Sequence, residues 1–290
     1  MRVLVTGGTG FIGAHLVKHL SGYDVSVASK HKSRNKKHYS LDIKDKKNLA
    51  TVFSKERPEY VFHLAARVNP RISMEKPIGD VEVNIIGTMN VLEMCRKYDS
   101  RKIIFSSSAA VYGEPKYLPV DEQHETLPIS IYGASKLVAE KYIETYCRAY
   151  GMEYTVLRYA NVYGPGSRSV ISIFIERILS GKSPVIFGNG NQKRDYIYVD
   201  DVVSATLAAM RKADGMTLNV STTTDTSVKD IYDIISGQLT SSAKPVYKPE
   251  NKGDINRIRL DNSVAKKQLD WIPEIDLMSG IIKTITGIRK

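Results

Sequence analysis

The sequence predicts an α/β protein built on a doubly wound parallel sheet, with a smaller C-terminal lobe. Two observations carry this prediction. Short β-branched runs alternate with amphipathic helical stretches over the first half of the chain, and a glycine-rich turn joins the first run to the first helical stretch. Such alternation is typical of parallel strands covered by helices on both faces, the Rossmann-type arrangement.

The buried runs predict the strands of this sheet, and periodicity near 3.6 residues predicts the helices between them. The expected strands are Val3–Thr6, Val25–Ala28, Tyr60–Leu64, Lys102–Ser106, Tyr154–Arg158 and Thr217–Val220. The expected helices are Phe11–Leu20, Val81–Tyr98, Tyr132–Tyr150, Ile171–Leu179 and Val199–Arg211. From this order we expect a dinucleotide-binding domain over residues 1–163 and 192–222, and a smaller substrate-binding lobe over 164–191 and 223–290.

Composition and charge exclude several classes of protein. With 42% hydrophobic and 25% charged residues, the chain resembles ordinary globular proteins, and no apolar run reaches the roughly 18–20 residues of a membrane span. We therefore expect a cytoplasmic protein with no membrane partner. The net charge is +11, but five cations crowd into residues 30–37 without an RNA-binding motif or zinc finger, so no nucleic-acid partner is expected. Cys95 and Cys147 lack metal-ligand spacing, and no metal is expected.

Three glycines mark a candidate phosphate-binding loop. Gly7, Gly10 and Gly13 lie between the first predicted strand and the first predicted helix. Glycine at these positions permits a tight turn, a backbone close to a pyrophosphate, and close packing of helix on strand. The start of the helix also offers free N–H groups to an anion. The loop therefore predicts a dinucleotide cofactor.

The residues after the second predicted strand bear on the choice between NAD and NADP. In NAD-binding domains an acidic residue about 20 residues beyond the glycine loop usually binds the adenosine ribose. Here Ser29 ends the strand, and Lys30, His31 and Arg34 follow it. A hydroxyl and several cations suit a 2′-phosphate, so the sequence favours NADP; the alternative is a surface loop whose charges touch nothing. Asp42, which follows the expected third strand, is placed to meet the adenine.

A tyrosine and a lysine four residues apart on a helix share one face. Of three such pairs in the chain, only Tyr132 and Lys136 open a long helix, and a predicted strand ending in three serines precedes them. A phenol has an ordinary pKa near 10, and a nearby ammonium favours its ionised form. We therefore expect Tyr132 and Lys136 to be catalytic together with a serine hydroxyl at this strand end, with Tyr132 as the base that takes a hydroxyl proton while hydride leaves for nicotinamide.

Several longer motifs together resemble the extended short-chain dehydrogenase/reductase family that acts on nucleotide sugars, the NAD-dependent epimerases and dehydratases. The motifs are TGGTGFIG, HLAA at His63–Ala66, VNIIGT with Asn84, FSSSAAVYG, YGASK, RYANVYGPG, QKRDYIYVDDV and GDINRIRLDNSVAKKQLDW. They run over almost the whole chain. The wording FSSSAxVYG is similar to that of UDP-glucose/UDP-galactose 4-epimerases, and the resemblance implies that Ser108 provides the catalytic hydroxyl beside Tyr132 and Lys136.

The resemblance implies a set of contact residues. The expected cofactor contacts are Gly7, Gly10, Phe11, Ile12, Gly13, Ser29, Lys30, His31, Arg34, Asp42, Ile43, Leu64, Ala65, Ala66, Asn84, Ser106, Tyr132, Lys136 and Tyr159. The expected substrate contacts are Ser108, Tyr132, Asn161, Arg194 and Arg257. The family also implies a homodimer that forms through the helices following Asn84 and Tyr132.

The residues after Ser108 indicate the reaction. Family dehydratases carry an Asp-Glu pair there and decarboxylases a Glu, whereas this chain has Ala109 and Ala110, which cannot transfer protons. The expectation is therefore a UDP-sugar 4-epimerase that passes hydride transiently to a tightly held NAD or NADP through a 4-keto intermediate. Two alternatives stay open: an NADPH-dependent nucleotide-sugar ketoreductase, and a non-catalytic NAD(P)-sensing module on the same fold.

Three departures from the family pattern leave the sugar open. Ser29 replaces the usual acidic residue, Asn251 stands where an arginine is common, and Ile258 occupies the position that gates bulky N-acetyl groups. Glucose/galactose, N-acetylhexosamine and uronic-acid substrates all stay possible on the sequence.

Overall fold

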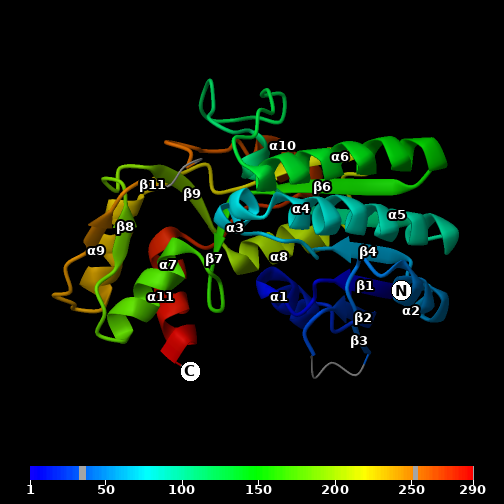
Figure 1. The fold of residues 1–290 in the computed structure, drawn as a ribbon, viewed down its shortest axis with the longest axis horizontal. Helices are drawn as coiled ribbons and strands as arrows, with labels where there is room; N and C mark the ends of the chain where they lie inside the picture. Colours follow the sequence, from blue (N-terminus) through cyan, green and yellow to red (C-terminus); the bar gives the residue numbers. More distant parts are fainter. Residues whose placement is uncertain (33–36, 251–253, 290) are drawn as a thin grey trace.

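Seven strands form one parallel sheet in the order β10-β6-β5-β4-β1-β2-β3. The structure, a computed structural model, describes residues 1–32, 37–250 and 254–289 (Figure 1). The strands are β1 (Arg2–Thr6), β2 (Asp24–Ser29), β3 (His38–Ser40), β4 (Tyr60–His63), β5 (Lys102–Ser108), β6 (Glu153–Tyr159) and β10 (Met216–Val220). Strand order reverses between β1 and β4, so the predicted doubly wound sheet is confirmed. Ligands bind such sheets at the carboxyl ends of the strands beside this reversal.

Successive residues of β1 feed two separate cores, one on each face of the sheet. Val3 and Val5 pack into the core that α1 and α8 cover, and Leu4 packs into the core that α2, α5 and α6 cover. The helices are α1 (Phe11–His19), α2 (Lys46–Glu56), α5 (Thr88–Lys97), α6 (Ile131–Tyr150), α8 (Val199–Ala208) and α10 (Ser263–Leu269). Burial on both faces explains why the strand sequences read as unbroken apolar runs.

The prediction of one continuous α-helix over Val81–Tyr98 is wrong. Its first part is the π-helical segment η1 (Val81–Gly87), and only then does α5 begin. Within η1, Asn84 donates to the Ser135 hydroxyl of α6 at 2.8 Å and to the Arg67 carbonyl at 3.1 Å. Side-chain periodicity alone does not distinguish this wider turn from an α-helix. The short helices α3 (Pro70–Glu75) and α4 (Pro77–Asp80) lead into η1, and no described helix could cross a membrane.

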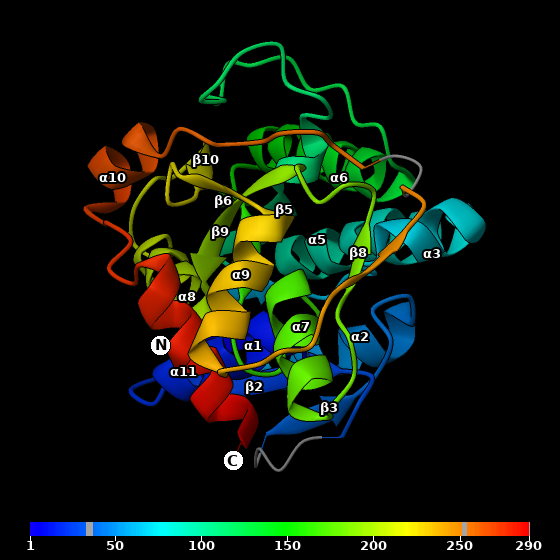
Figure 2. The same cartoon turned by 90° about the vertical axis from the view of Figure 1, so that its left-hand side faces the viewer.

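The second lobe gathers at one end of the sheet, where Figure 2 turns it toward the viewer. Its strands form two small sheets, β11-β9-β7 and β12-β8. The elements are β7 (Asn161–Tyr163), α7 (Val170–Leu179), β8 (Val185–Phe187), β9 (Lys193–Tyr198), β11 (Asp225–Ser227), α9 (Val228–Gln238), β12 (Val246–Lys248) and α11 (Leu277–Arg289). The expected ranges group β7 and β9 with the large sheet, yet both pair within the small one. The division into two domains stays a prediction.

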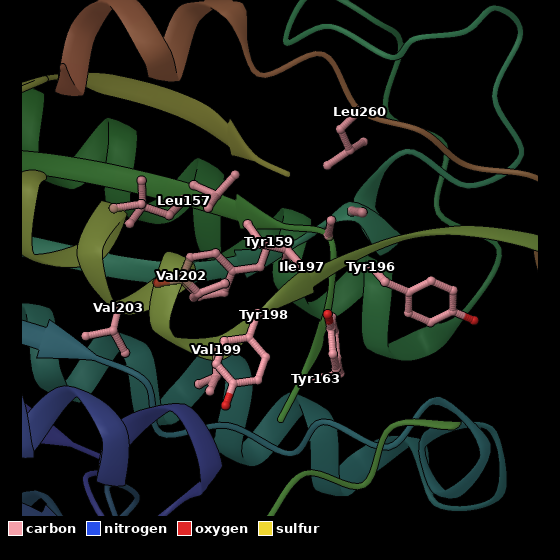
Figure 3. Packing of buried hydrophobic residues seen from close by; sticks show 14 of the residues in the cluster. Leu157, Tyr159, Tyr163, Tyr196, Ile197, Tyr198, Val199, Val202, Val203 and Leu260 are labelled. Atoms are coloured by element: carbon pink, nitrogen blue, oxygen red, sulfur yellow. The ribbon is translucent and has the colours of Figure 1, made fainter. Parts of the chain in front are cut away.

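One continuous core joins the lobe to the large sheet. Tyr159 of β6 and Val202 of α8 lie in the same cluster as the tyrosines of β7 and β9 (Figure 3). Tyr163 packs edge-on against Tyr198, with ring centroids 5.5 Å apart. Such aromatic pairs add to the free energy of simple apolar burial. The lobe is therefore fixed against the carboxyl ends of β5 and β6.

Helix α6 begins in close contact with the end of β5. Ser130 caps the helix by accepting from the Gly133 N–H at 3.1 Å, which satisfies one of its free donors. At Gly133 a methyl group would collide with the carbonyl oxygen of Ala110, which lies in the 3₁₀ turn η2 (Ala109–Val111) directly after β5. The absence of a side chain at Gly133 thus allows the first turn of α6 to lie against the strand end.

We expect Gly133→Ala to lower the free energy of unfolding by about 1–3 kcal/mol, because the added methyl has no space beside Ala110. The matched control is Gly237→Ala in α9, where a Cβ meets nothing within 4 Å. This control should raise the free energy of unfolding by about 0.5–1 kcal/mol, because alanine lowers the backbone entropy of the unfolded chain. Urea unfolding monitored by circular dichroism measures both. Equal effects of the two variants would contradict this packing argument.

Candidate active site

A cavity of about 1070 Å³ opens at the carboxyl ends of β1, β4, β5 and β6. Its walls run from the glycine loop at Gly7 to Ile258 in the C-terminal lobe. Pockets for one small molecule commonly enclose about 300–1,000 Å³. The cavity therefore has room for a dinucleotide and a second ligand.

The glycine loop has the geometry that a pyrophosphate site requires. Gly7 adopts φ +72°, and its N–H donates to the Ala28 carbonyl at 2.8 Å. A methyl group on Gly13 would collide with the Gly7 carbonyl oxygen. Helix α1 begins directly after Gly10 with no side-chain cap, and Phe11 lines the cavity. Its first N–H groups are thus left for an anionic ligand.

The Ser29 hydroxyl, expected to help bind a 2′-phosphate, already has protein partners. Its Oγ donates to the His31 carbonyl at 3.1 Å and lies 2.9 Å from Nε2 of His38. Both Ser29 and His31 line the cavity. Arg34, the most distal cation of the expected set, lies outside the described residues.

Lys30 and Asp42 form an ion pair at this end of the cavity, with Nζ 2.9 Å from Oδ2. Burial opposes ionisation of Asp42, but the Lys30 ammonium and the Lys44 N–H hold the pKa of this carboxyl below its ordinary value. Asp42 and Ile43 line the cavity where they were expected. The positive charge of Lys30 is therefore balanced by a neighbouring carboxylate.

The structure brings Ser108, Tyr132 and Lys136 together at one wall of the cavity. Ser108 is the last residue of β5, and its hydroxyl hydrogen-bonds the Tyr132 phenol. Lys136 is buried; its ammonium donates to the Ser106 carbonyl at 2.7 Å and lies 4.5 Å from the centre of the Phe105 ring. A carbonyl and an aromatic face both favour a cation in an otherwise apolar place.

Burial is the main influence on the acid–base properties of Tyr132 and Lys136. Burial, with a smaller contribution from Asp80, raises the pKa of Tyr132 to about 12, and the Ser108 hydroxyl opposes the rise. Burial lowers the pKa of Lys136 to about 7, and the Glu140 carboxylate opposes that fall. Burial therefore favours the neutral form of both side chains.

Most of the expected contact residues line this one cavity. The members found there are Gly7, Gly10, Phe11, Ile12, Gly13, Ser29, Lys30, His31, Asp42, Ile43, Leu64, Ala65, Ala66, Ser106, Ser108, Tyr132, Lys136, Tyr159, Asn161 and Arg194.

Two expected residues are placed elsewhere. Arg257 pairs with the Asp225 carboxylate and does not line the cavity. Asn84 is buried behind the cavity wall, where its side-chain oxygen accepts from the Arg67 N–H at 2.8 Å. Its amide supports the wall from behind.

Several cavity residues were missed from the sequence. Arg67 lines the wall and pairs with the buried Asp80 at 2.9 Å, and Arg168 and Phe187 reach the cavity from the lobe. Arg168 follows an irregular glycine–proline turn, where no periodicity indicates which way a side chain points. The sequence offered one signal for these cavity residues, their position next to motifs that resemble those of the family. Among the described residues, no group of three or more His, Cys, Asp or Glu side chains could hold a metal ion.

Comparison with known proteins places the chain among sugar-nucleotide enzymes. Residues 3–221 match the model of the "NAD dependent epimerase/dehydratase family". The putative UDP-glucose 4-epimerase of Methanocaldococcus jannaschii is 44% identical, over 99% of this chain and 98% of that protein. The UDP-glucose 4-epimerase of Thermotoga maritima, solved with UDP-glucose, is 43% identical with a TM-score of 0.97 over 100% and 99% of the two chains. The Thermus thermophilus UDP-glucose 4-epimerase, solved with NAD, is 33% identical with a TM-score of 0.95 over 100% and 99%.

Proposed function

The chain belongs to the NAD dependent epimerase/dehydratase family, and from that premise we propose that it is a UDP-sugar 4-epimerase that interconverts UDP-glucose and UDP-galactose. One observation carries the proposal. The Ser108–Tyr132–Lys136 trio faces the same cavity as the glycine loop, and only alanines follow Ser108 along that wall. Similarity to UDP-glucose 4-epimerases over the full chain supports this choice of sugar.

The chain's own residues supply binding and proton transfer. NAD, held by the glycine loop, would supply reversible hydride transfer at the sugar C4, so no reductant would be consumed. Tyr132 and Ser108 hold the O4 oxygen, and Tyr132 takes its proton during oxidation and returns it during reduction. Lys136, which donates to the Ser106 carbonyl, would hold the nicotinamide ribose. Asn161 and Arg194 hold the diphosphate of the sugar nucleotide.

Ala109 and Ala110 restrict the reaction to redox chemistry at C4. Both line the cavity directly after Ser108. Elimination of water or loss of carbon dioxide needs an acid or base beside the ring, and a methyl group supplies neither. The same trio would serve an NADPH-dependent ketoreductase, which differs from an epimerase by its stoichiometric use of reductant.

We expect the wild-type protein to convert UDP-glucose to UDP-galactose without added reductant, and Tyr132→Phe to lower kcat by about 10²–10⁴-fold, since proton transfer is lost. The cofactor should stay bound, because the phenyl ring still fills the site. Tyr142→Phe, an exposed tyrosine on the same helix, is the control and should match wild type. Chromatography of a UDP-sugar panel and of the nucleotide released on denaturation provides the measurement.

Two results would refute this assignment. NADPH oxidation in proportion to a 4-keto sugar, without any epimer, would identify a ketoreductase. A bound dinucleotide with no turnover of any sugar nucleotide would identify a sensing module.

We propose NAD as the cofactor, in place of the NADP that the sequence favoured. The Ser29 hydroxyl is engaged with His31 and His38, and the Lys30 charge is paired with Asp42, so neither is held for a 2′-phosphate. NAD is also the dinucleotide found with the similar Thermus enzyme.

We expect NAD to bind at least about tenfold more tightly than NADP, a difference of about 1.4 kcal/mol. Lys30→Ala should weaken the binding of NAD and the binding of NADP by the same factor, because Lys30 pairs with Asp42 and does not contact a phosphate. Fluorescence titration of protein stripped of nucleotide measures both affinities. A loss of affinity for NADP alone would instead indicate that Lys30 contacts the 2′-phosphate.

We also propose that the enzyme is a cytoplasmic homodimer that forms through η1, α5 and α6. Large apolar side chains lie exposed on this helical face, among them Ile86 at 51% and Tyr142 at 47%. The two segments that carry them, η1 and α6, pack directly against each other. An apolar face of this kind is typical of protein–protein contacts.

We expect wild type to be a dimer, and Ile86→Asp combined with Tyr142→Asp to be a monomer, because two charges at the centre of the interface would lack partners. Ile272→Asp, which changes a residue that is 61% exposed outside this face, should leave the dimer intact. Light scattering coupled to size-exclusion chromatography determines the mass. A monomeric wild type would disprove the dimer.

A further inference from the structure

A buried polar network lies directly beneath the catalytic trio, and the proposed chemistry does not use it. Its centre is Glu140 of α6, which is 3% exposed. The carboxylate accepts from the Ser107 hydroxyl of β5, and Arg158 of β6 donates to both of its oxygens, with Nε 3.1 Å from Oε1 and Nη2 2.7 Å from Oε2. Burying such charges is costly, so a buried pair is weak support for stability by itself. The position of the network relative to the trio suggests a different role.

Three successive turns of α6 each contact one of the last three residues of β5. Residues at intervals of four lie on one stripe of a helix. Tyr132 bonds the Ser108 hydroxyl, Lys136 bonds the Ser106 carbonyl, and Glu140 bonds the Ser107 hydroxyl. Glu140 is thus the third point at which the helix is fixed to the strand that ends in Ser108.

The Glu140 carboxylate is itself held by the next strands of the sheet. Arg158 is the direct register partner of Ser107 across β5 and β6, so their side chains emerge together beneath α6. Arg158 also donates to the Tyr112 hydroxyl at 2.9 Å, and that hydroxyl donates to Asn219 of β10 at 2.7 Å. The anchor of the catalytic helix therefore extends over three neighbouring strands.

Glu140 is also the charge that most directly favours the ammonium of Lys136. Burial lowers the pKa of Lys136 to about 7, and the Glu140 carboxylate acts in the opposite direction. From β4, His63 faces the same lysine, but burial and the Lys136 charge lower its pKa to about 3, so it is neutral. Arg158 of β6 faces the carboxylate of Glu140, and burial raises the pKa of Tyr132 on the same helix to about 12.

We propose that Glu140 is a positioning residue for the epimerase reaction: through Ser107 and Arg158 it fixes Lys136 and Tyr132 against Ser108. The inference rests on the proposed function and names a group that touches neither sugar nor cofactor. Displacements of about 1 Å in such a site can cost 10²-fold in rate.

The first test is Ser107→Ala, which releases β5 from Glu140 and leaves the ion pair with Arg158 intact. We expect kcat to fall about tenfold while KM and NAD affinity stay within about twofold, because binding is kept and alignment is lost. The matched control is Ser100→Ala, two residues before β5 begins. Ser100 is as buried as Ser107, at 4% exposure, and its hydroxyl donates to the Pro58 carbonyl at 2.7 Å. The control should keep wild-type turnover.

The second test removes the charges as a pair with Glu140→Gln combined with Arg158→Gln, so that no buried charge is left alone. The Glu140 carboxylate opposes the fall in the Lys136 pKa, so its loss should move the alkaline limb of kcat to lower pH. Glu144→Gln, one turn further along the same stripe of α6, should leave the pH profile unchanged, since Glu144 pairs with the surface cations Lys141 and Arg148.

A wild-type kcat and pH profile in both Ser107→Ala and the double variant would overturn the proposal and reduce the network to a stabilising role. If the double variant does not fold, Ser107→Ala against Ser100→Ala decides alone. Failure of the proposed function is a separate result, because it would appear as a wild-type protein that epimerises no UDP-sugar.

Discussion

The contact between the start of α6 and the end of β5 is the constraint on which the site depends. Gly133 brings the first turn of the helix against the Ala110 carbonyl, and this close approach places Tyr132 beside Ser108. The Lys136 ammonium then reaches the Ser106 carbonyl within the same buried seam. A buried ammonium without these partners would lose its proton or destabilise the fold. The contact between α6 and β5 is therefore needed both for the packing of the fold and for the placement of Tyr132 and Lys136.

The parts of the site that could be predicted from the sequence are those in which local geometry demands one residue type. Gly7 must adopt φ +72°, and Gly13 has no space for a side chain, so both stand out in the sequence. Tyr132 and Lys136 were separable from the other Tyr/Lys pairs because a helix start and a serine-terminated strand surround them. The sheet was predictable for a related reason, since strands buried on both faces leave long apolar runs.

The expectations that the structure does not support involve partners that the local sequence does not reveal. Arg257 was expected to contact the substrate, but it pairs with Asp225, 32 residues earlier, and does not line the cavity. The preference for NADP lost its support in a similar way, because Lys30 was read as a free cation but pairs with Asp42 in the fold. A sequence shows which side chains are charged, but only the fold shows which of them are paired with an opposite charge. The long-range network around Glu140 has no local signature at all.

The far wall of the cavity has a consequence for how the enzyme is made. Ile258 and its neighbours reach their place by pairing with distant chain: the Val120 N–H donates to the Arg259 carbonyl at 2.8 Å, and the Lys193 N–H to the Asn256 carbonyl at 2.9 Å. Domains fold from the N-terminus as the chain leaves the ribosome. The glycine loop and the catalytic helix are therefore synthesised well before the segment that closes the cavity. Under the proposed function, the residues that would hold the dinucleotide are thus synthesised before those that would enclose the sugar nucleotide.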